Sequence, residues 1–269
     1  MSLTSEGPAA TPEAGRVGVL TVQRGMQVLR AFRSERASLS NAEIVRRTGL
    51  SKATVSRLTS TLMQLGFLRH VPEGREFVLG TAALGIGHSY IVSSQLAAIA
   101  NPLLQDLADT LGMSVALSTR DGLDMLYLGY KTSDQVATLR MGVGTVLPMG
   151  VTAGGHAYLW GLAADHREPL YSEILRRAAN PARISRIVQA SFAELDADGI
   201  CGVFGEYQRS VYAIALPVMV GPESVVMGLS CGRAQLSHDG AAERRRIAPV
   251  LRNASEQLEK ALADLNEQP

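Results

Sequence analysis

Residues 40–70 constrain the fold of this chain more than any other part of the sequence. Ser40, followed three residues later by Glu43, forms a capping box that starts a helix, and Gly49 is the residue best suited to end it. Ser51 can then cap a second helix directly afterwards. A short helix, a turn containing glycine and a second helix with a polar start are typical of a helix-turn-helix.

The second helix has two chemically different faces. Its apolar face consists of Val55, Leu58, Leu62 and Leu65, which we expect to anchor it on the domain. The opposite face carries hydroxyl and cationic groups, which can read base edges in a DNA major groove, and the helix start attracts phosphate. We predict that Ser51 and Lys52 lie near phosphates, and that the base-edge contacts come from Thr54, Ser56 and Arg57.

A short hairpin follows this helix. Pro72, Glu73 and Gly74 form a turn signal between two short alternating segments, which predicts a two-stranded wing. Its basic side chains can meet the DNA backbone or minor groove, and for each one alone a solvated surface position is an equally good interpretation. These side chains are Arg69, His70 and Arg75. Together with a preceding helix over 19–33, the pattern predicts a winged helix-turn-helix.

The charges are divided unevenly along the chain. Residues 16–80 hold eleven arginines and lysines against four glutamates, whereas residues 81–269 hold 15 basic and 19 acidic residues. A small basic module joined to a mildly acidic one indicates that the first meets a polyanion. Uneven surface charge is common, so this pattern supports the motif without deciding the function.

The remainder of the chain predicts an α+β domain. A helix over 81–97 is expected to act as a linker, a second helix follows over 100–112, and a final helix covers 239–265. Between them lie β-rich runs separated by turn signals, including one over 136–142. Antiparallel strands with helices gathered at both ends favour a central antiparallel sheet. The expected organisation is a disordered tail at 1–16, a DNA-binding domain at 17–80, the linker helix at 81–97 and an effector and oligomerisation domain at 98–269.

Several classes of site and location are disfavoured by the sequence. No apolar run approaches a membrane span of about 20 residues, and the start of the chain does not resemble a secretory signal. Cys201 and Cys231 lack metal-ligand or disulfide spacing, and the histidines are scattered, so no metal site or cofactor is expected. We expect a cytoplasmic protein without catalytic residues.

A glycine-rich segment over 140–161 is the candidate ligand site. Glycines allow close approach of the backbone to a ligand, and the start of the helix that follows can hold a carboxylate. Tight packing of a loop on a sheet needs the same glycines and is an equally good interpretation. The favoured interpretation of His156 is structural, and methionines of this region suit either a core or an apolar pocket wall.

In several stretches the chain resembles the IclR family of bacterial transcriptional regulators. These are VQRGMQVLRAF (22–32), LSNAEIVRRTGLSKATVSRLTSTLMQLGFLRH (39–70), REFVLGTAALGIG (75–87), GTVLPMGVTAGGHAYLWGL (144–162) and DGICGVFGEYQRSVYAIALPV (198–218). The resemblance implies a winged-helix domain, a linker helix and a GAF-like domain that binds a small organic or aromatic acid. It also implies dimers, often paired as tetramers, on double-stranded DNA operators with inverted repeats.

The resemblance also directs attention to particular effector-binding residues. Ser230 keeps a hydroxyl that the family has, whereas Ala213 and Gly232 stand where relatives often have polar side chains. Together with the glycine-rich segment, the predicted effector-binding set is Met141, Gly144, Met149, Gly154, Gly155, His156, Ala157, Ala213 and Ser230.

Two other functions compete with a ligand-responsive regulator. One is a hydrolase that uses Cys201 or Cys231 and is fused to a DNA-binding domain; no nearby motif supplies an activating base. The other is an architectural DNA binder whose second domain only oligomerises, in which case the glycine-rich segment serves packing alone. The sequence leaves open the effector, the target promoter and whether the protein represses or activates.

Overall fold

The computed structural model describes residues 19–33, 37–72, 74–134, 136, 141–235 and 239–265. The chain forms two compact units, with a boundary between Ala83 and Leu84. Three predictions lie wholly or partly outside the described residues: the tail at 1–16, the turn at Glu73 and most of the strand over 136–142.

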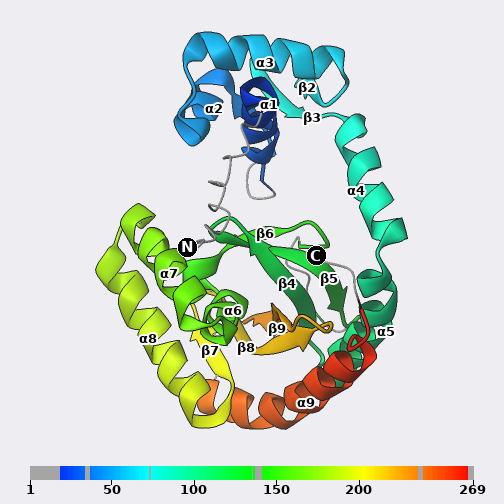
Figure 1. Ribbon diagram of the computed structural model, residues 1–269, viewed down its shortest axis with the longest axis vertical. Helices are drawn as coiled ribbons and strands as arrows, with labels where there is room; N and C mark the ends of the chain where they lie inside the picture. The colour runs from blue at the N-terminus through cyan, green and yellow to red at the C-terminus, as the bar shows by residue number, and fades with distance from the viewer. Residues whose placement is uncertain are drawn as a thin grey trace, which may run out of the picture. The chain divides into compact units, whose positions relative to one another are not determined.

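The amino-terminal unit packs three helices against a small antiparallel sheet. Its elements are α1 (Leu20–Arg30), β1 (Leu39–Ser40), α2 (Asn41–Thr48), α3 (Lys52–Gln64), β2 (Leu68–His70) and β3 (Glu76–Leu79) (Figure 1). The strand order is β1-β3-β2. Helices and strands share one apolar core, to which Val28, Ile44, Val55, Leu68 and Phe77 contribute. The winged helix-turn-helix predicted from the sequence is confirmed.

Local capping fixes the turn between α2 and α3. Ser40 Oγ accepts a hydrogen bond from the Glu43 N–H at 3.3 Å, and Ser51 Oγ accepts one from the Thr54 N–H at 3.2 Å. Gly49 ends α2 with φ 70°, a left-handed conformation that glycine adopts without the strain of a side chain. The residues that determine this turn therefore lie next to it in the sequence, which explains why the motif can be recognised from the sequence alone.

The connector between the units is shorter than predicted. Helix α4 covers Thr81–Ser93, and α5 begins afresh over Gln95–Leu111. Ser94 interrupts them because its Oγ caps α5, accepting a hydrogen bond from the Ala97 N–H at 3.2 Å. The expected single helix over 81–97 is therefore wrong at its carboxy-terminal end.

The carboxy-terminal unit is built on a six-stranded antiparallel sheet with strand order β6-β5-β4-β9-β8-β7. Its remaining elements are β4 (Ser114–Asp121), β5 (Asp124–Thr132), β6 (Val146–Pro148), a 3-10 turn (Met149–Val151), α6 (Ala153–Gly161), α7 (Ala164–Arg177), α8 (Pro181–Asp198), β7 (Cys201–Phe204), β8 (Val211–Val220), β9 (Val225–Ala234) and α9 (Gly240–Ala261). The predicted α+β class with a central antiparallel sheet is confirmed. Strand β6 and helix α7, which contains Pro169, were not anticipated.

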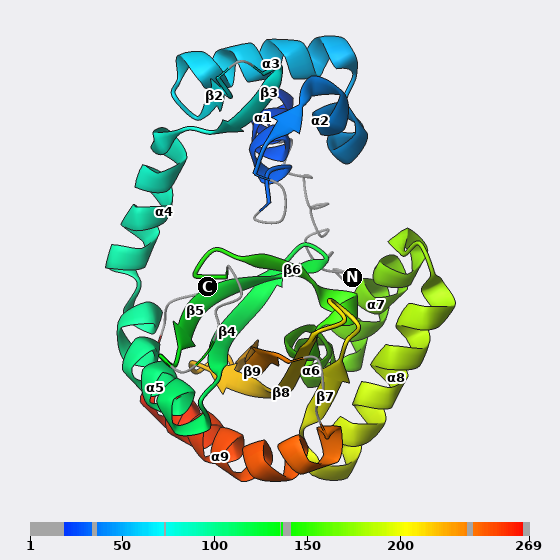
Figure 2. The same cartoon turned by 180° about the vertical axis from the view of Figure 1, so that it is seen from behind.

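The two faces of this sheet carry side chains of different size. Helices α5 and α9 lie side by side on one face, while α6 lies on the other (Figures 1 and 2). Strand positions facing α5 and α9 are large: Val115, Leu117, Ile214, Leu216, Leu229 and Cys231. The alternate positions, which face α6, are small: Ser114, Ala116, Ser118, Ala213, Ala215, Ser230 and Gly232.

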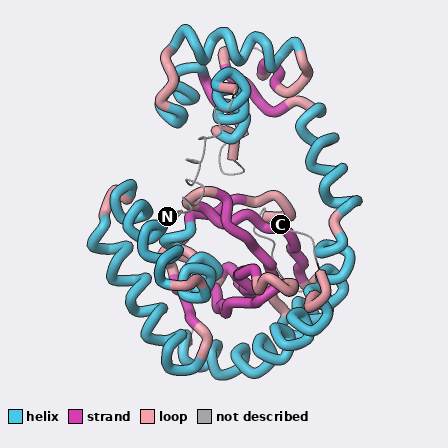
Figure 3. Tube along the Cα trace, viewed as in Figure 1, coloured by secondary structure: helices cyan, strands magenta, loops and turns pink. Residues whose placement is uncertain are grey.

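This difference in side-chain size determines which face of the sheet is tightly packed and which face borders a cavity. The large side chains make a continuous core with the leucines of α5 and α9. The strands lie at the centre with helices around them, as the tube drawing shows (Figure 3). The small side chains leave space between the sheet and the start of α6, and this space is the pocket described below.

Candidate functional site

Helix α3 presents the polar face that the sequence predicts. Ser51, Lys52, Ser56 and Arg57 are exposed, whereas Thr54 is half-buried with its Oγ1 2.9 Å from Ser51 Oγ. Lys52 and Arg57 form no ion pair with any residue that the structure describes. Their charges therefore remain available to an external anion.

The inner face of α3 departs from the prediction at one position. Val55 and Leu62 are buried, and Leu58 packs against the core from a half-buried position. Leu65 is 60% exposed, because α3 ends at Gln64 and the chain turns away. The expectation that Leu65 anchors the helix is wrong.

The cations of α2 are in a different state from those of α3. Both Arg46 and Arg47 donate hydrogen bonds to the Glu43 carboxylate, with distances of 2.6 to 2.8 Å. Hydrogen bonds from Arg46, which has the larger effect, and from Arg47 lower the pKa of Glu43 to about 2. Arg47 also donates to the Ala31 carbonyl at 2.8 Å, so its role is to fasten α2 to the end of α1.

The wing places its three predicted residues on the surface. Arg69, His70 and Arg75 are all exposed. The His70 ring lies against Phe77, with 4.6 Å between ring centroids, so a core residue supports it from beneath. An exposed cationic strand beside an exposed cationic helix is an arrangement that can follow a DNA backbone.

A pocket lies in the carboxy-terminal unit between the first turn of α6 and the small-residue face of the sheet. The space between its walls is about 680 Å³, a figure that includes space open to solvent. Its walls are apolar side chains and hydroxyl groups, and none of the described residues that line it carries a charged side chain. The lining is Ser114, Val115, Ala116, Ser118, Met125, Tyr127, Tyr130, Met141, Leu147, Val151, Thr152, Ala153, Gly154, Gly155, Val203, Tyr207, Val211, Ala213, Ser230 and Gly232.

The structure brings part of the predicted effector-binding set into this pocket. Met141, Gly154, Gly155, Ala213 and Ser230 line it. The other four predicted residues lie elsewhere: Gly144, Met149, His156 and Ala157. Neighbouring positions on a helix point in different directions, so a run of adjacent residues cannot all face one cavity.

Three of these four residues have simple structural positions. Met149 and Ala157 are fully buried in two different core clusters on this side of the sheet. Gly144 is exposed and has φ 86°, so it serves a turn. Glycine is suited to that conformation because it has no side chain to clash.

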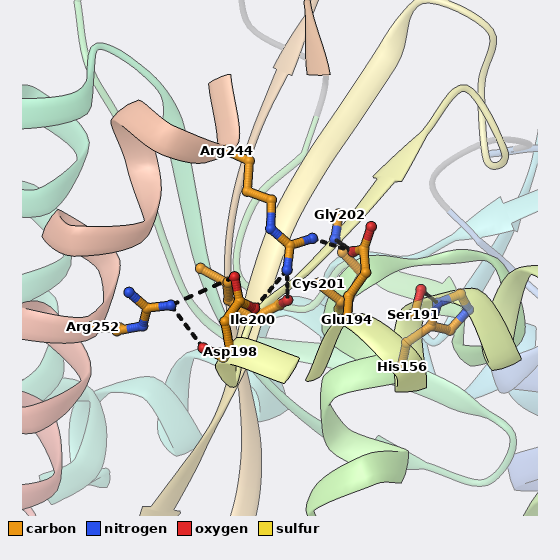
Figure 4. Close-up of polar contacts among 10 residues, drawn as sticks. His156, Ser191, Glu194, Asp198, Ile200, Cys201, Gly202, Arg244 and Arg252 are labelled. Atoms are coloured by element: carbon orange, nitrogen blue, oxygen red, sulfur yellow. Dashed lines mark hydrogen bonds and ion pairs between the residues drawn. The ribbon is translucent and has the colours of Figure 1, made fainter. Parts of the chain in front are cut away.

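His156 is buried and fully bonded within the protein. Its Nδ1 lies 2.7 Å from Ser191 Oγ (Figure 4). Its Nε2 lies 3.1 Å from the Gly150 carbonyl. Since a carbonyl only accepts, Nε2 carries the proton and Nδ1 accepts from the serine hydroxyl. Burial lowers the pKa of His156 to about 4. Among the interpretations considered for this residue, the structural one accounts for its contacts.

The start of α6 forms one end of the pocket. Ala153, Gly154 and Gly155 line it, and the first turn of a helix leaves its N–H groups without intrahelical partners. Thr152 does not cap them, because its hydroxyl donates to the Pro148 carbonyl at 3.0 Å. Ser230, only 7% exposed, faces the same place, and its Oγ has no hydrogen-bond partner among the described residues. This end of the pocket offers donors to an anion.

The two glycines of this turn differ in how much space surrounds them. A Cβ on Gly154 would lie 3.5 Å from Ser118 Oγ and 3.6 Å from Ser230 Oγ, which is ordinary contact. A Cβ on Gly155 would lie 2.2 Å from the Met149 carbonyl oxygen. Gly155 is therefore required for backbone packing even though it also lines the pocket.

Several pocket residues were missed by the sequence analysis. The hydroxyl-bearing ones are Ser114, Ser118, Tyr127, Tyr130, Thr152 and Tyr207. A signal for the serines is present in the sequence, since Ser-Val-Ala-Leu-Ser (114–118) and Gly-Leu-Ser-Cys-Gly (228–232) alternate small with large residues. No comparable local pattern indicates the tyrosines.

Neither cysteine has the surroundings of a nucleophile. The Cys201 and Cys231 thiols are buried and lie 3.6 Å and 3.7 Å from the Ala153 and Ile214 carbonyls, to which they donate. Burial raises the pKa of both thiols, that of Cys231 to about 12. A thiolate is the reactive form, so these thiols are held in their inert state.

A polar network holds β7 against the helices. Arg244 of α9 donates to Asp198 at 2.6 Å and to the Ile200 carbonyl, and it pairs with Glu194 (Figure 4). Glu194 in turn accepts from the Gly202 N–H at 2.8 Å. The start of β7 is thereby fixed to α8 and α9 together.

The described residues contain neither a metal-binding cluster nor a helix that could span a membrane. No group of three or more histidine, cysteine or acidic side chains there is arranged to hold a metal ion. No helix within the described ranges is long and apolar enough to cross a lipid bilayer.

The amino-terminal unit exposes the cationic second helix of a helix-turn-helix, and the carboxy-terminal unit contains a pocket. Together these features define a DNA-binding regulator of the helix-turn-helix class. Residues 21–72 match the model of the IclR helix-turn-helix domain, and residues 88–260 match that of the bacterial transcriptional regulator IclR carboxy-terminal domain. The chain belongs to the IclR family of transcriptional regulators. This is a family of regulators rather than enzymes, so the hydrolase alternative is excluded.

Similar proteins agree with this assignment. The chain is 30% identical over 249 residues to the Pca regulon regulatory protein of Pseudomonas putida, covering 88% of this chain and 82% of the relative. An IclR family regulator from Brucella abortus has a similar structure, with a TM-score of 0.81, 30% identity and coverage of 92% and 94% of the two chains. The same fold occurs in an IclR homologue from Microbacterium hydrocarbonoxydans solved with 4-hydroxybenzoate, with a TM-score of 0.61, 18% identity and coverage of 90% and 98%.

The buried His156 predicts a pH dependence of stability. Its pKa is about 4 in the folded protein against 6.5 ordinarily, so between these values the unfolded chain binds a proton that the folded chain does not. Unfolding should therefore become easier as pH falls from about 6.5, by about 1.4 kcal/mol per pH unit. Urea denaturation at pH 7.5 and pH 5 should show a loss of about 2 kcal/mol from this group. The variant His156→Gln should lose this part of the pH dependence; an unchanged difference would show that another group causes it.

Proposed function

We propose that this regulator reads an inverted-repeat operator with α3 in the major groove and that a small organic acid in the pocket alters its affinity for that operator. The observation that carries the DNA-binding mode is the unpaired state of Lys52 and Arg57 on α3, in contrast to the two arginines of α2, which share the Glu43 carboxylate. Ser51 at the N-cap of the helix, and Thr54 and Ser56 in its first turns, add hydroxyl groups near these cations. In this proposal residues 17–80 are the DNA-binding domain and residues 98–269 the effector domain.

The observation that carries the effector proposal is the unpartnered Ser230 hydroxyl beside the uncapped first turn of α6. Backbone N–H groups and a hydroxyl can hold one carboxylate without a cationic side chain. The remaining walls are tyrosine rings, methionines and small apolar residues, which suit an aromatic or apolar body. A monocarboxylic acid fits this combination better than a dianion, because no charged side chain among the described lining residues offsets a second negative charge.

The names of similar proteins point in the same direction. One relative regulates a Pca regulon, and one protein of the same fold was solved with 4-hydroxybenzoate. An aromatic monocarboxylate is therefore the first class of ligand to test. The architectural alternative, a DNA binder without an effector, does not account for a hydroxyl-lined pocket whose serine lacks a partner.

Substitutions in α3 should separate base reading from phosphate binding. Arg57→Ala should cost about 1–3 kcal/mol of operator affinity and relax discrimination between operator and mutated operator. Lys52→Ala should weaken binding to all sequences alike and reduce the salt slope by about one unit, because one phosphate contact is lost. Titrations by fluorescence anisotropy at several salt concentrations would measure both. Unchanged discrimination in Arg57→Ala would remove this residue from sequence reading.

Two small substitutions should test the anion end of the pocket. Calorimetry with 4-hydroxybenzoate and its neutral amide should show tighter binding of the acid to the wild type. Ser230→Ala should weaken acid binding by about 1.5–3 kcal/mol, the value of a hydrogen bond to a charged group. Gly154→Ala adds a methyl group between two hydroxyls without a backbone clash and should also weaken it.

The exposed Ser172 of α7 supplies the matched control, and Ser172→Ala should bind like the wild type. Gly155 is unsuitable for this test, since any side chain there meets the Met149 backbone. Operator affinity should change roughly 5–150-fold with ligand, the usual size of allosteric coupling. Equal binding of acid and amide by the wild type would contradict a carboxylate site at α6.

Helix α4 supports the proposal that two copies assemble. None of its residues is buried, yet Leu84, Ile86 and Val92 are exposed by 73%, 65% and 71%. Exposed apolar side chains of this density on one helix indicate a protein partner. A second copy of the chain is the partner that an inverted-repeat operator requires. Pairing of such dimers would give the proposed tetramer.

Replacing these three side chains by glutamine should therefore break the dimer while keeping the helix, since glutamine is a good helix former. Sedimentation should give the monomer mass, and operator binding should weaken because two linked half-site contacts no longer support one another. Met219→Gln, another exposed apolar position at 37%, is the control. A dimer of the triple variant as stable as that of the wild type would place the interface elsewhere.

A further inference from the structure

Strand register gives the pocket two distinct ends. On β4, Ser118 pairs with Gly228 of β9, close to the first turn of α6. Four residues earlier, Ser114 pairs with Gly232, and that row continues through Ala213 to Val203. Four residues of strand span about 13 Å. Ser230 pairs with Ala116 between these rows, so the second row lies about 7 Å from Ser230 and marks the other end of the pocket.

The remote end has its own polar chemistry. The Tyr130 hydroxyl donates to Ser114 Oγ at 3.0 Å, and Ser114 Oγ lies 3.2 Å from Thr132 Oγ1. The Tyr127 and Tyr130 rings are nearly parallel, with centroids 6.0 Å apart. A third tyrosine, Tyr207, lines the pocket from the loop 205–210, which joins β7 to β8 beyond this row. This end can recognise a substituent on an aromatic body.

The loop that carries Tyr207 is held to α8 by one arginine. Arg183 Nε donates to the Glu206 carboxylate at 3.0 Å, and Arg183 Nη2 donates to the Glu206 backbone carbonyl at 2.9 Å. A further contact joins Nη2 to the same carboxylate. Arg183 thus fixes both the side chain and the backbone of the residue preceding Tyr207.

The strength of this attachment matters for ligand entry. The Arg183 and Glu206 side chains are 42% and 25% exposed, and solvent-exposed ion pairs of this kind stabilise by only about 0.2–1 kcal/mol. Within the loop, Gly205 N–H donates to the Val211 carbonyl and Val211 N–H to the Gln208 carbonyl, both at 2.9 Å. The loop is therefore shaped internally, attached to α8 by an exposed ion pair, and joined to the residue after β9 because Gln235 N–H donates to the Ser210 carbonyl at 2.6 Å.

We propose that Tyr207 is a specificity-determining residue that reads the end of the effector remote from its carboxylate, and that the Arg183–Glu206 pair is a latch that positions it. Opening of this latch lets the loop 205–210 move away from the pocket, and closing brings the tyrosine against the ligand. This inference rests on the proposed effector site, but the latch itself can be tested without any ligand.

The first experiment measures amide hydrogen exchange of residues 205–211 in the ligand-free full chain. Arg183→Gln and Glu206→Gln should each accelerate exchange in this segment roughly two- to fivefold, as expected for loss of an exposed ion pair. The control is Arg176→Gln on α7, which removes a more exposed arginine that donates twice to Glu173. That control should leave the segment unchanged. Unchanged exchange in both latch variants, with exchange elsewhere like the wild type, would overturn the latch.

The second experiment measures selectivity by calorimetry with 4-hydroxybenzoate and benzoate as probes. Tyr207→Ala should change the ratio of their dissociation constants at least fivefold, whereas Ser230→Ala should weaken both by similar factors and leave the ratio alone. An unchanged ratio in Tyr207→Ala would overturn the role of Tyr207. Failure of both acids to bind the wild type would overturn the proposed effector class and with it this role, while the exchange result would still decide the latch.

Discussion

The carboxy-terminal unit depends on the alternation of large and small side chains along β4, β8 and β9. Large residues such as Leu117 and Ile214 face α5 and α9 and form the continuous core that holds the sheet. Small residues such as Ala116 and Gly232 lie on the α6 side and leave the pocket beside the first turn of that helix. One face of these strands therefore forms the packed core, and the opposite face forms the pocket. A cavity on one face is tolerated because the other face supplies the packing.

In the amino-terminal unit, pairing with a carboxylate determines which cationic side chains remain unpaired and can contact DNA. Glu43 binds both arginines of α2, and one of them is also fixed to the end of α1. The cations of α3 have no such carboxylate among the described residues. Intramolecular pairing therefore engages the arginines of α2 and leaves the cations of α3 unpaired, although both helices belong to the same basic unit.

Features set by residues close together in the sequence could be predicted, whereas features that depend on residues far apart could be predicted only in part. The helix-turn-helix was predictable because caps and turn, from Ser40 to Ser51, are set by neighbours in sequence. The pocket was only partly predictable because its walls come from strands far apart in the chain. His156 was placed with the ligand since it follows two pocket glycines, but its ring turns toward Ser191. Helix α7 could not be predicted because Pro169 interrupts its helical pattern and only three of its residues are buried.

The two close backbone approaches at the start of α6 also limit how this pocket can change. A Cβ on Gly155 would meet the Met149 carbonyl oxygen at 2.2 Å, and one on Gly228 would meet that of Gly154 at 2.6 Å. The helix start is thus stacked backbone on backbone and leaves no room for new side chains at these points. Redesign for a different ligand must instead use the strand side chains opposite, where enlarging Ala116 or Ala213 would reshape the cavity over an unaltered helix start.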